Sequence, residues 1–260
     1  MKIHLIYTHS ELRNFTYLIE TDDKDAIVID PWDAPTITKI IDAHTLTLSA
    51  IINTHEHWDH TQGNAALVEQ YGCEVWAHEN TKGKIPGFSL GLKGNEFISL
   101  GNETGLKVID TPGHSAGHLC FKVIEGGRVS SVFTGDILLN AGVGRCDNGG
   151  NVDLLYDTIV REILTLNGEV SVYPGHEYLE NNLRFTLSVE PTNSDAKNWL
   201  ERITAEKSSN IPIVTTIADE LKINTFLRVS QDSLRESLGC AARAEDVEVF
   251  RRLRLKRDQW

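Results

Sequence analysis

One run of six residues, HEHWDH at 55–60, constrains this chain more than any other feature. It directly follows residues 48–53, an apolar run that predicts a buried strand, and it leads into a helical pattern over 60–72. His55 and His57 are two residues apart, so in extended backbone their side chains point to the same side. Packing does not explain four potential metal ligands in six residues. The segment therefore predicts a metal site at the end of a strand.

Three later segments repeat this pattern of a potential ligand placed just after a predicted strand. Each contains glycine, and two also contain proline, so the chain can turn sharply and present one side chain. The segments are Thr111-Pro112-Gly113-His114, Thr134-Gly135-Asp136 and Tyr173-Pro174-Gly175-His176. Any one of them alone is typical of a solvated turn, but the set predicts a single site built from several strand ends.

The chemistry of these side chains favours two metal ions. Neutral imidazole and carboxylate bind zinc, iron and manganese alike. Five histidines and two aspartates are too many for one ion, and a carboxylate can bridge two ions and offset their repulsion. A water between two divalent ions is deprotonated near neutral pH and becomes a hydroxide nucleophile. We therefore expect two divalent metal ions, zinc in the first place, with iron or manganese as alternatives.

The order of the expected elements predicts an α/β protein in two parts. Strands are expected over 2–8, 15–21, 26–30, 48–53, 74–77, 95–99, 105–110, 118–124, 128–133 and 169–173. Helices are expected over 35–43, 60–72 and 153–165. From about residue 180 the strand signals disappear, and helical periodicity marks 180–190, 195–207 and 244–258. We expect a mixed domain to about residue 175 and a smaller helical domain after it.

The overall charge limits the partners. The net charge is −12, whereas binding to nucleic acid phosphates needs clustered lysine and arginine. We find no signal-peptide pattern at the N-terminus and no apolar run long enough to span a membrane. These observations predict a cytoplasmic protein that acts on a small molecule, without nucleic acid or membrane partners, and we expect a monomer.

The HxHxDH run, with His114, Asp136 and His176 in that order, resembles the metallo-β-lactamase superfamily. The resemblance implies an αββα sandwich with the metals at one edge. It also implies that His55, His57 and His114 hold one metal and that Asp59, His60 and His176 hold the other. Asp136 would bridge the two, and Asp59 and Asp136 would be the catalytic carboxylates.

The rest of the chain is similar to glyoxalase II, the hydroxyacylglutathione hydrolase family. The similar segments are PGHEY at 174–178, ENNLRF at 180–185, VEPTN at 189–193, Ile211-Pro212, Ala218-Asp219-Glu220, INTFLR at 223–228 and RLKRDQW at 254–260. This likeness implies a catalytic domain over 1–178 and a helical substrate-binding domain over 179–260. It also implies hydrolysis of S-lactoylglutathione, or a related 2-hydroxyacylglutathione, as a step of methylglyoxal detoxification.

Four residues match the positions that contact glutathione in that family. They are Arg145, Tyr178, Arg254 and Arg257. Arginine suits this task because its guanidinium binds a carboxylate through two hydrogen bonds. The loop after Arg145, Cys146-Asp147-Asn148-Gly149-Gly150, departs from the family, which usually has an aromatic residue and Glu-Gly there. We expect this departure to affect substrate affinity more than chemistry.

Two further residues are expected to support the site without binding metal. His118 begins a predicted strand, and Asp30 ends one that faces the same edge. The alternative function is an oxidoreductase, a persulfide dioxygenase-like iron enzyme of the same superfamily that acts on glutathione persulfide. The C-terminal helical domain argues against this alternative.

Overall fold

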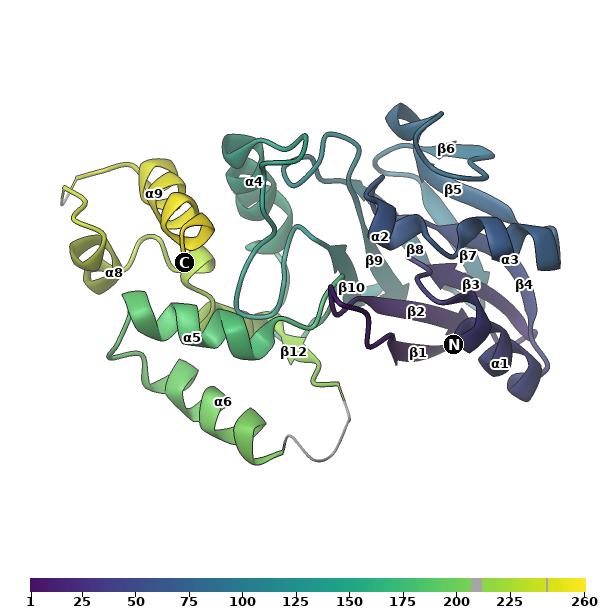
Figure 1. Cartoon of the computed structure of the whole chain (residues 1–260), viewed down its shortest axis with the longest axis horizontal. Coiled ribbons are helices and arrows are strands. Elements are labelled where there is room, and N and C mark those ends of the chain that lie inside the picture. The colour runs from purple at the N-terminus through teal and green to yellow at the C-terminus, as the bar shows by residue number, and fades with distance from the viewer. Residues whose placement is uncertain (207–211, 242) are drawn as a thin grey trace.

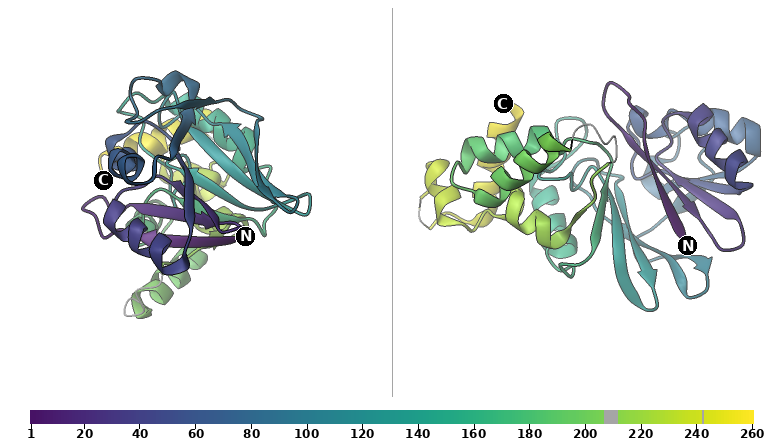
Figure 2. Two further views of the ribbon diagram at one scale, coloured as in Figure 1. Left: turned by 90° about the vertical axis from the view of Figure 1, so that its right-hand side faces the viewer. Right: turned by 90° about the horizontal axis from the view of Figure 1, so that it is seen from below.

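A computed structural model describes residues 1–206, 212–241 and 243–260 of the chain. Two six-stranded sheets pack face to face, and helices cover both outer faces (Figures 1 and 2). In Figure 1 the helices α1 and α3 lie on the right, and α5, α6, α8 and α9 lie on the left. The αββα sandwich implied by the sequence is confirmed.

The first sheet has the order β1-β2-β3-β4-β5-β6. Its strands are β1 (Lys2–Tyr7), β2 (Phe15–Glu20), β3 (Asp25–Ile29), β4 (Thr47–Ile52), β5 (Glu74–His78) and β6 (Leu90–Leu92). The β1, β2 and β3 strands pair antiparallel, and β3 to β6 pair parallel. The carboxyl ends of β3 and β4 therefore open at the same edge.

The second sheet has the order β12-β11-β10-β9-β8-β7. Its strands are β7 (Phe97–Gly101), β8 (Thr104–Asp110), β9 (Leu119–Glu125), β10 (Arg128–Gly135), β11 (Ser171–Pro174) and β12 (Thr215–Thr216). The β10 and β11 strands pair parallel, so the segments after both strands leave the sheet at one edge. Asp136 and His176 follow these two ends.

Helices occur in both parts of the chain. The N-terminal part contains α1 (Ala34–His44), α2 (Trp58–Thr61), α3 (Asn64–Tyr71), η1 (Glu79–Thr81), α4 (Val152–Thr158) and the π-helical continuation η2 (Ile159–Ile163). The C-terminal part contains α5 (Leu179–Val189), α6 (Ser194–Ala205), α7 (Ile217–Ile223), η3 (Thr225–Leu227), α8 (Asp232–Ser237) and α9 (Asp246–Asp258). Lys207, the last residue of one expected helix, and Ile211 of the glyoxalase II-like segments lie outside the described residues.

Separate apolar clusters join these layers. Phe15 and Ile29 of the first sheet meet Phe121 and Phe133 of the second in the space between the sheets. A second cluster packs α1 and α3 against the first sheet. A third joins the second sheet to α4 and α9, so the C-terminal helices share a core with the sandwich. This shared core fixes the C-terminal helices beside the edge where the strand ends meet.

Several expected elements differ from the observed ones. The helix expected over 60–72 is two helices, α2 and α3, because the amide of Gly63 bonds outside the helix. The amide of Gly63 donates to the carbonyl of Pro31 at 2.8 Å, and a Cβ there would lie 2.9 Å from that oxygen. The sequence also missed β6 and β12, and β12 shows that strand structure does not end at residue 180. Among the described residues, none of the helices has the length and apolar character needed to cross a membrane.

Candidate metal centre

The seven residues expected to bind metal come together where strand ends of the two sheets meet. The first sheet supplies four of them, after β4 and in α2, and the second sheet supplies three, after β8, β10 and β11. One group is His55, His57 and His114, and another is Asp59, His60 and His176. Within each group, one candidate ligand atom per residue lies within 4.8 Å of the others.

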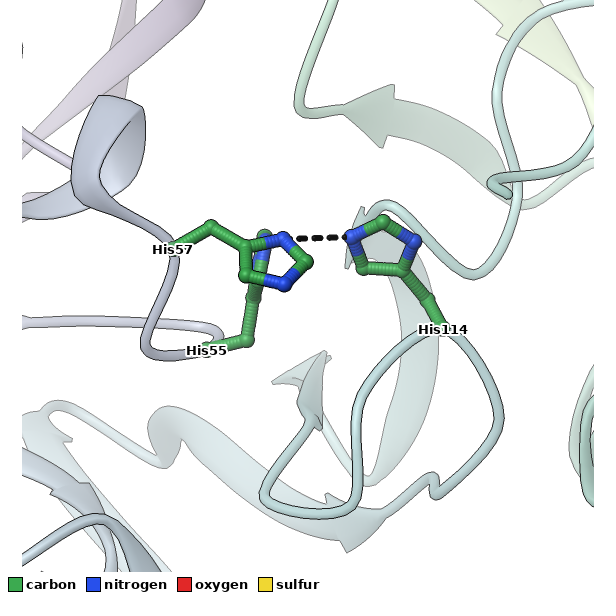
Figure 3. Close-up of side chains that lie close together, drawn as sticks. All are labelled: His55, His57 and His114. Atoms are coloured by element: carbon green, nitrogen blue, oxygen red, sulfur yellow. Dashed lines mark hydrogen bonds between the residues drawn. The ribbon is translucent and has the colours of Figure 1, made fainter. Parts of the chain in front are cut away.

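The first group brings three imidazoles together (Figure 3). His57 Nδ1 lies 2.9 Å from His114 Nε2 and 3.1 Å from His55 Nε2. The outer nitrogens of two rings meet backbone carbonyls, since His57 Nε2 is 3.1 Å from Asn148 O and His114 Nδ1 is 2.6 Å from Arg145 O. A carbonyl only accepts, so each outer nitrogen carries the hydrogen and each inner nitrogen presents a lone pair. Inward lone pairs at this separation favour a cation between them.

Asp30 fixes one histidine of each group from behind. Its carboxylate accepts from the backbone amide of Thr54 at 2.7 Å and from the Thr54 hydroxyl at 2.6 Å. Because that hydroxyl donates to Asp30, its oxygen is free to accept from His55 Nδ1 at 2.9 Å. Asp30 also lies 2.9 Å from His60 Nδ1. One buried carboxylate therefore turns the Nε2 atoms of His55 and His60 toward the centre, in the supporting position expected for Asp30.

The second group is fixed by the loop between β1 and β2. His60 Nε2 lies 3.2 Å from His176 Nε2, and Asp59 Oδ2 lies 3.3 and 3.4 Å from these two atoms. His176 Nδ1 is 2.7 Å from the carbonyl of Leu12. Asn14 Nδ2 donates to Asp59 Oδ2 at 2.9 Å. Sequence reasoning missed Asn14, because no motif surrounds it and only the fold brings it beside Asp59.

Asp136 lies between the two groups. Its Oδ2 is 3.5 Å from His114 Nε2 and 3.2 Å from His176 Nε2, and its Oδ1 is 3.7 Å from His60 Nε2. Asp136 Oδ1 is buried and has no hydrogen-bond partner among the described residues. A buried carboxylate oxygen without a partner is strongly unfavourable unless a cation is present. The donor set therefore fits divalent cations on both sides of Asp136.

His118 supports Asp136 without pointing at the centre. Its Nε2 accepts the backbone N–H of Asp136 at 3.1 Å, so its Nδ1 carries the hydrogen and meets Thr111 Oγ1 at 2.9 Å. The ring is fully buried, and burial together with the neighbouring His114 lowers its pKa well below the ordinary value. His118 is therefore a neutral support for the turn that presents Asp136, which agrees with its expected role.

The protonation of the site reflects a cavity that attracts cations. Burial opposes charge on His60, but Asp30 and Asp136 outweigh it and raise the pKa of His60 well above its ordinary value. Burial also opposes ionisation of Asp59 and Asp136, yet contacts with neighbouring histidines hold both pKa values well below the usual range. Burial and the nearby histidines lower the pKa of His55. A proton on His60 offsets the negative charge of the neighbouring carboxylates. A bound metal ion would offset the same charge instead of that proton.

Two glycines allow the backbone to approach the ligands closely. A Cβ on Gly175 would lie 2.3 Å from Asp136 Oδ1 and 2.8 Å from His60 Cε1. A Cβ on Gly144 would lie 2.1 Å from the carbonyl oxygen of Asp136 and 2.8 Å from His114 Nδ1. At Gly144 the nearest atom is a backbone oxygen, and at Gly175 the nearest atoms belong to the ligand side chains themselves, so a Cβ at either position would displace part of the ligand arrangement.

A cavity of about 430 Å³ opens beside the metal centre. It is lined by ligands of both groups, including His57, Asp59 and Asp136. The lining also includes all four residues expected to contact glutathione, Arg145, Tyr178, Arg254 and Arg257. We call Arg145, Arg254 and Arg257 the arginine wall.

The arginines of this wall differ in how many of their N–H groups already donate hydrogen bonds within the protein. Arg254 is 3% exposed and donates to the carbonyls of Val143 and Gly144, at 3.0 and 3.3 Å, and to Asp258 at 2.8 Å. Burial lowers its pKa, although Asp258 opposes the shift. Arg254 therefore holds the loop ahead of Arg145 in place, a bonding pattern that the sequence did not reveal.

Arg257 keeps more of its hydrogen-bonding capacity. It donates to Asn182 Oδ1 at 3.2 Å, and its guanidinium lies against the rings of Phe185 and Trp260, 5.3 and 5.1 Å from their centroids. The aromatic faces orient the guanidinium without using its N–H groups. Arg257 is thus half-buried and oriented, with donors left for a ligand.

Tyr178 and Arg145 complete the cavity. The Tyr178 ring stacks on His176 with centroids 4.9 Å apart and an interplanar angle of 2°. Burial and the Asp136 charge raise the Tyr178 pKa, so its hydroxyl remains protonated. The Arg145 side chain is 64% exposed and pairs with Asp147 at 2.6 Å.

The loop that departs from the glyoxalase II pattern, residues 146–150, touches the metal ligands through its backbone. Asn148 meets His57 through its carbonyl, as Arg145 does for His114. Backbone carbonyls remain when side chains change. The unusual side chains of this loop are therefore compatible with an intact ligand arrangement.

Comparison with known proteins gives two family matches that together cover residues 10–260. Residues 10–176 match the metallo-beta-lactamase superfamily, and residues 177–260 match the C-terminal region of hydroxyacylglutathione hydrolase. Both match the likeness seen in the sequence, and they meet beside the expected domain boundary.

Individual proteins show the same relationship. A hydroxyacylglutathione hydrolase from a Polaromonas species is 40% identical, with all of both chains covered. A protein of Arabidopsis thaliana named cytoplasmic hydroxyacylglutathione hydrolase is 30% identical over 95% of each chain. Among solved structures, ETHE1 from Myxococcus xanthus is 25% identical, with a TM-score of 0.68 over 96% of this chain and 90% of that one.

Proposed function

Because the chain belongs to the hydroxyacylglutathione hydrolase family of the metallo-β-lactamase superfamily, we propose that it hydrolyses S-lactoylglutathione or a related 2-hydroxyacylglutathione. The products are a 2-hydroxy acid and glutathione. The observation that carries this proposal is one cavity lined by two different sets of side chains. One set contains histidines with inward-facing nitrogens and Asp136, whose Oδ1 has no hydrogen-bond partner among the described residues, and the other contains three arginines, of which Arg257 is oriented by aromatic rings.

We assign two divalent metal ions to the centre, with zinc as the first choice and iron or manganese as alternatives. His55, His57 and His114 would hold one ion, and Asp59, His60 and His176 the other. Asp136 would bridge them, since its two oxygens approach histidines of both groups. When bound, such ions lower the pKa of a coordinated water and polarise a carbonyl oxygen.

The protein side chains position the reacting groups. Asn14 holds the Asp59 carboxylate, and the stacked ring of Tyr178 covers one face of His176. Arg257 and Arg145 supply donors for the carboxylates of the glutathione part, and Arg254 adds positive charge while it holds the loop ahead of Arg145. The catalytic carboxylates in this proposal are Asp59 and Asp136.

The reaction balances without a further reactant. The oxygen of a water molecule bonds to the thioester carbonyl carbon, and the carbon–sulfur bond then breaks. The sulfur leaves as the thiolate of glutathione and takes up one proton, equivalent to one of the two that the water gives up. The other passes to solvent as the 2-hydroxy acid ionises, so no strongly acidic side chain is needed. One water is consumed for each thioester cleaved.

The alternative from the sequence is a persulfide dioxygenase-like iron enzyme, and its support is weaker. The C-terminal region, residues 177–260, matches the hydrolase family, and the Polaromonas hydrolase is similar along the whole chain. The test supplies the metal-loaded protein with S-lactoylglutathione while free thiol release is followed, and with glutathione persulfide in an oxygen electrode. Thiol release without oxygen uptake supports the hydrolase, and the opposite pattern contradicts it.

We further propose a cytoplasmic monomer that acts on a small molecule and needs neither nucleic acid nor membrane. The Arabidopsis relative is named cytoplasmic, and the net charge of −12 disfavours binding to phosphate polymers. The proposed division is a catalytic domain over 1–178 and a substrate-binding domain over 179–260, and the two family matches support it. Sedimentation analysis of the metal-loaded protein tests the oligomeric state.

A further inference from the structure

Three side chains gather at the end of the first sheet remote from the metal centre: His4 of β1, Glu20 of β2 and His44 at the end of α1. The β2 strand begins beside Asn14 of the metal centre and ends at Glu20, so the two places are separated by the length of the strand. We propose that these three residues, which we call the outer histidine cluster, form a separate Zn²⁺ site.

The geometry is that of a three-ligand site with an open face. His4 Nε2 lies 2.8 Å from Glu20 Oε2, and His44 Nδ1 lies 3.7 Å from the same oxygen. One ligand atom from each residue lies within 4.8 Å of the others, and the two imidazoles meet edge to face with centroids 4.7 Å apart. Zinc bonds of roughly 2.0–2.2 Å in a tetrahedron place ligand atoms about 3.2–3.6 Å apart. The two separations from Glu20 Oε2 lie on either side of that range, and the two histidine nitrogens lie within 4.8 Å of each other, so a side-chain adjustment brings the three atoms onto one ion.

The fold holds the cluster in place before any ion binds. His4 lies opposite Leu18 in the β1–β2 ladder, and Glu20 follows two residues after Leu18 on the same face. Helix α1 packs on this face through Ile37 and Ile41, which share a core with Leu18. The helix ends at His44, where Thr45 takes a left-handed conformation and its amide caps carbonyls of the last turn. All three ligands are therefore carried by ordered elements.

The character of the ligands selects zinc-like ions. Two imidazoles and one carboxylate suit Zn²⁺ or another late transition-metal ion better than Mg²⁺ or Ca²⁺, which prefer oxygen. The His44 side chain is 37% exposed, whereas those of His4 and Glu20 are 13% and 11% exposed. An ion can therefore enter from the His44 side and keep a water molecule there.

Lys24 is the main competitor for the carboxylate. Its Nζ bonds Glu20 Oε1 at 2.7 Å, which leaves Oε2 for the cluster. Hydrogen bonds from Lys24 and His4 lower the pKa of Glu20 to about 2, so the carboxylate is ionised in the whole physiological range. The lysine charge repels a bound cation, and the affinity of the site is accordingly expected to be moderate.

The test measures zinc uptake by the protein with its catalytic metals already loaded. Wild type and His44→Ala are dialysed to equilibrium against free Zn²⁺ buffered at several micromolar concentrations, and bound zinc per chain is counted. Wild type should bind one more zinc per chain than His44→Ala. Zinc should also raise the melting temperature of wild type more than that of the variant, because the ion joins the end of α1 to the β1–β2 hairpin.

Two further variants make the result specific. His9→Ala removes an exposed histidine outside the cluster and should bind as much zinc as wild type. Lys24→Ala removes the competing charge and should tighten the additional site by about tenfold. Equal zinc uptake by wild type and His44→Ala would overturn the proposal. The catalytic metals are common to both samples, so this outcome does not depend on whether the chain hydrolyses a glutathione thioester.

Discussion

The two sets of side chains that line the cavity are held in different ways. Among the metal ligands, each histidine has a hydrogen-bond partner at the ring nitrogen that faces away from the centre. Asp30 is this partner for His60, and the carbonyl of Leu12 is this partner for His176. On the arginine wall, Arg254 is already bonded to two carbonyls and a carboxylate, whereas Arg257 is held mainly against two aromatic rings.

This difference separates chemistry from affinity. A metal ligand must be fixed closely, because a shift of its donor atom changes the coordination of the ion. A residue that binds a remote part of the substrate contributes mainly to affinity. Substitution of a metal ligand should therefore lower turnover, and substitution of Arg257 should lower substrate affinity. Substitution of Arg254 should lower both.

Asp136→Ala should have the largest effect. Removing the carboxylate between the two ligand groups leaves the cations without a bridge, and metal content should fall toward one ion or fewer per chain. Because metal-assisted catalysis contributes several kcal/mol, kcat/KM for S-lactoylglutathione should fall by more than about 10³-fold. Metal analysis and kinetics on the same sample check this, with Asp110→Ala, an exposed carboxylate, as the control. A variant with two metals and nearly normal turnover would show that Asp136 does not bridge.

Arg254→Ala should have the next largest effect, because it lowers stability as well as turnover. The change leaves Asp258 without its nearest guanidinium and frees the loop whose next carbonyl, that of Arg145, orients His114. We expect a loss of about 2–3 kcal/mol in the free energy of unfolding and a lower kcat. Urea unfolding and steady-state kinetics measure both, with the exposed Arg251→Ala of the same helix as control. If Arg254→Ala changes KM alone and leaves stability intact, the loop-holding role is wrong.

Arg257→Ala should mainly raise KM. One charge-assisted contact contributes roughly 1.5–3 kcal/mol, which corresponds to about ten- to hundredfold in kcat/KM. Partial exposure and salt move the expected value toward the lower end of that range. The matched substrate is a simple lactoyl thioester that lacks the glutathione carboxylates, and its hydrolysis should hardly change. Equal losses on both substrates would mean that Arg257 supports the fold of the helical region, and the substrate-binding role would have to be dropped.

Glu220→Gln should have the smallest effect on turnover and a clear effect on pH dependence. The Glu220 carboxylate is buried and accepts from the amide of Ala141, the amide of Asn224 and the hydroxyl of Thr215. Burial outweighs these hydrogen bonds and raises the pKa of Glu220 to about 7 from 4.5. The folded protein therefore keeps a proton that the unfolded chain loses, and stability falls as pH rises from about 4.5 to 7.

The shift corresponds to at most about 3–4 kcal/mol over that window. Glutamine cannot ionise, so the variant should show a flatter stability profile between pH 5 and 8 than wild type. Urea unfolding at both pH values measures the difference, and Glu201→Gln, an exposed position, is the control. Identical pH profiles for wild type and Glu220→Gln would rule out a titrating Glu220.

The family resemblance implied the sandwich, and the motifs themselves predicted the gathering of the strand-end ligands for a physical reason. Strand ends of a sandwich meet at one edge, so ligands placed after β4, β8, β10 and β11 had to lie near one another. Helix α2 was merged with α3, because the amide of Gly63 bonds Pro31, a contact that local periodicity does not encode. The two-residue strand β12 was missed, since its pairing with β11 depends on the fold and its length gives no pattern.

The residues that hold the metal ligands and their loops in place were only partly predictable. Asp30 and His118 stood out because each lies at a strand terminus beside the expected site. Asn14 did not, although it donates directly to Asp59. The hydrogen bonds that fix the Arg254 side chain were equally unpredictable, because the acceptors at Val143 and Gly144 are more than a hundred residues away along the chain. Motif spacing shows which residues gather, but the contacts of each one depend on the packing of distant segments.

The central claim is that this protein hydrolyses a glutathione thioester when its candidate centre holds metal. The most direct measurement titrates metal-stripped His44→Ala protein, which lacks the outer zinc site, with Zn²⁺. Bound metal and the rate of S-lactoylglutathione hydrolysis are measured on the same samples. We predict no hydrolysis in the stripped protein and full activity when two zinc ions are bound per chain. Hydrolysis without metal, or two bound zinc ions without hydrolysis, would contradict the account.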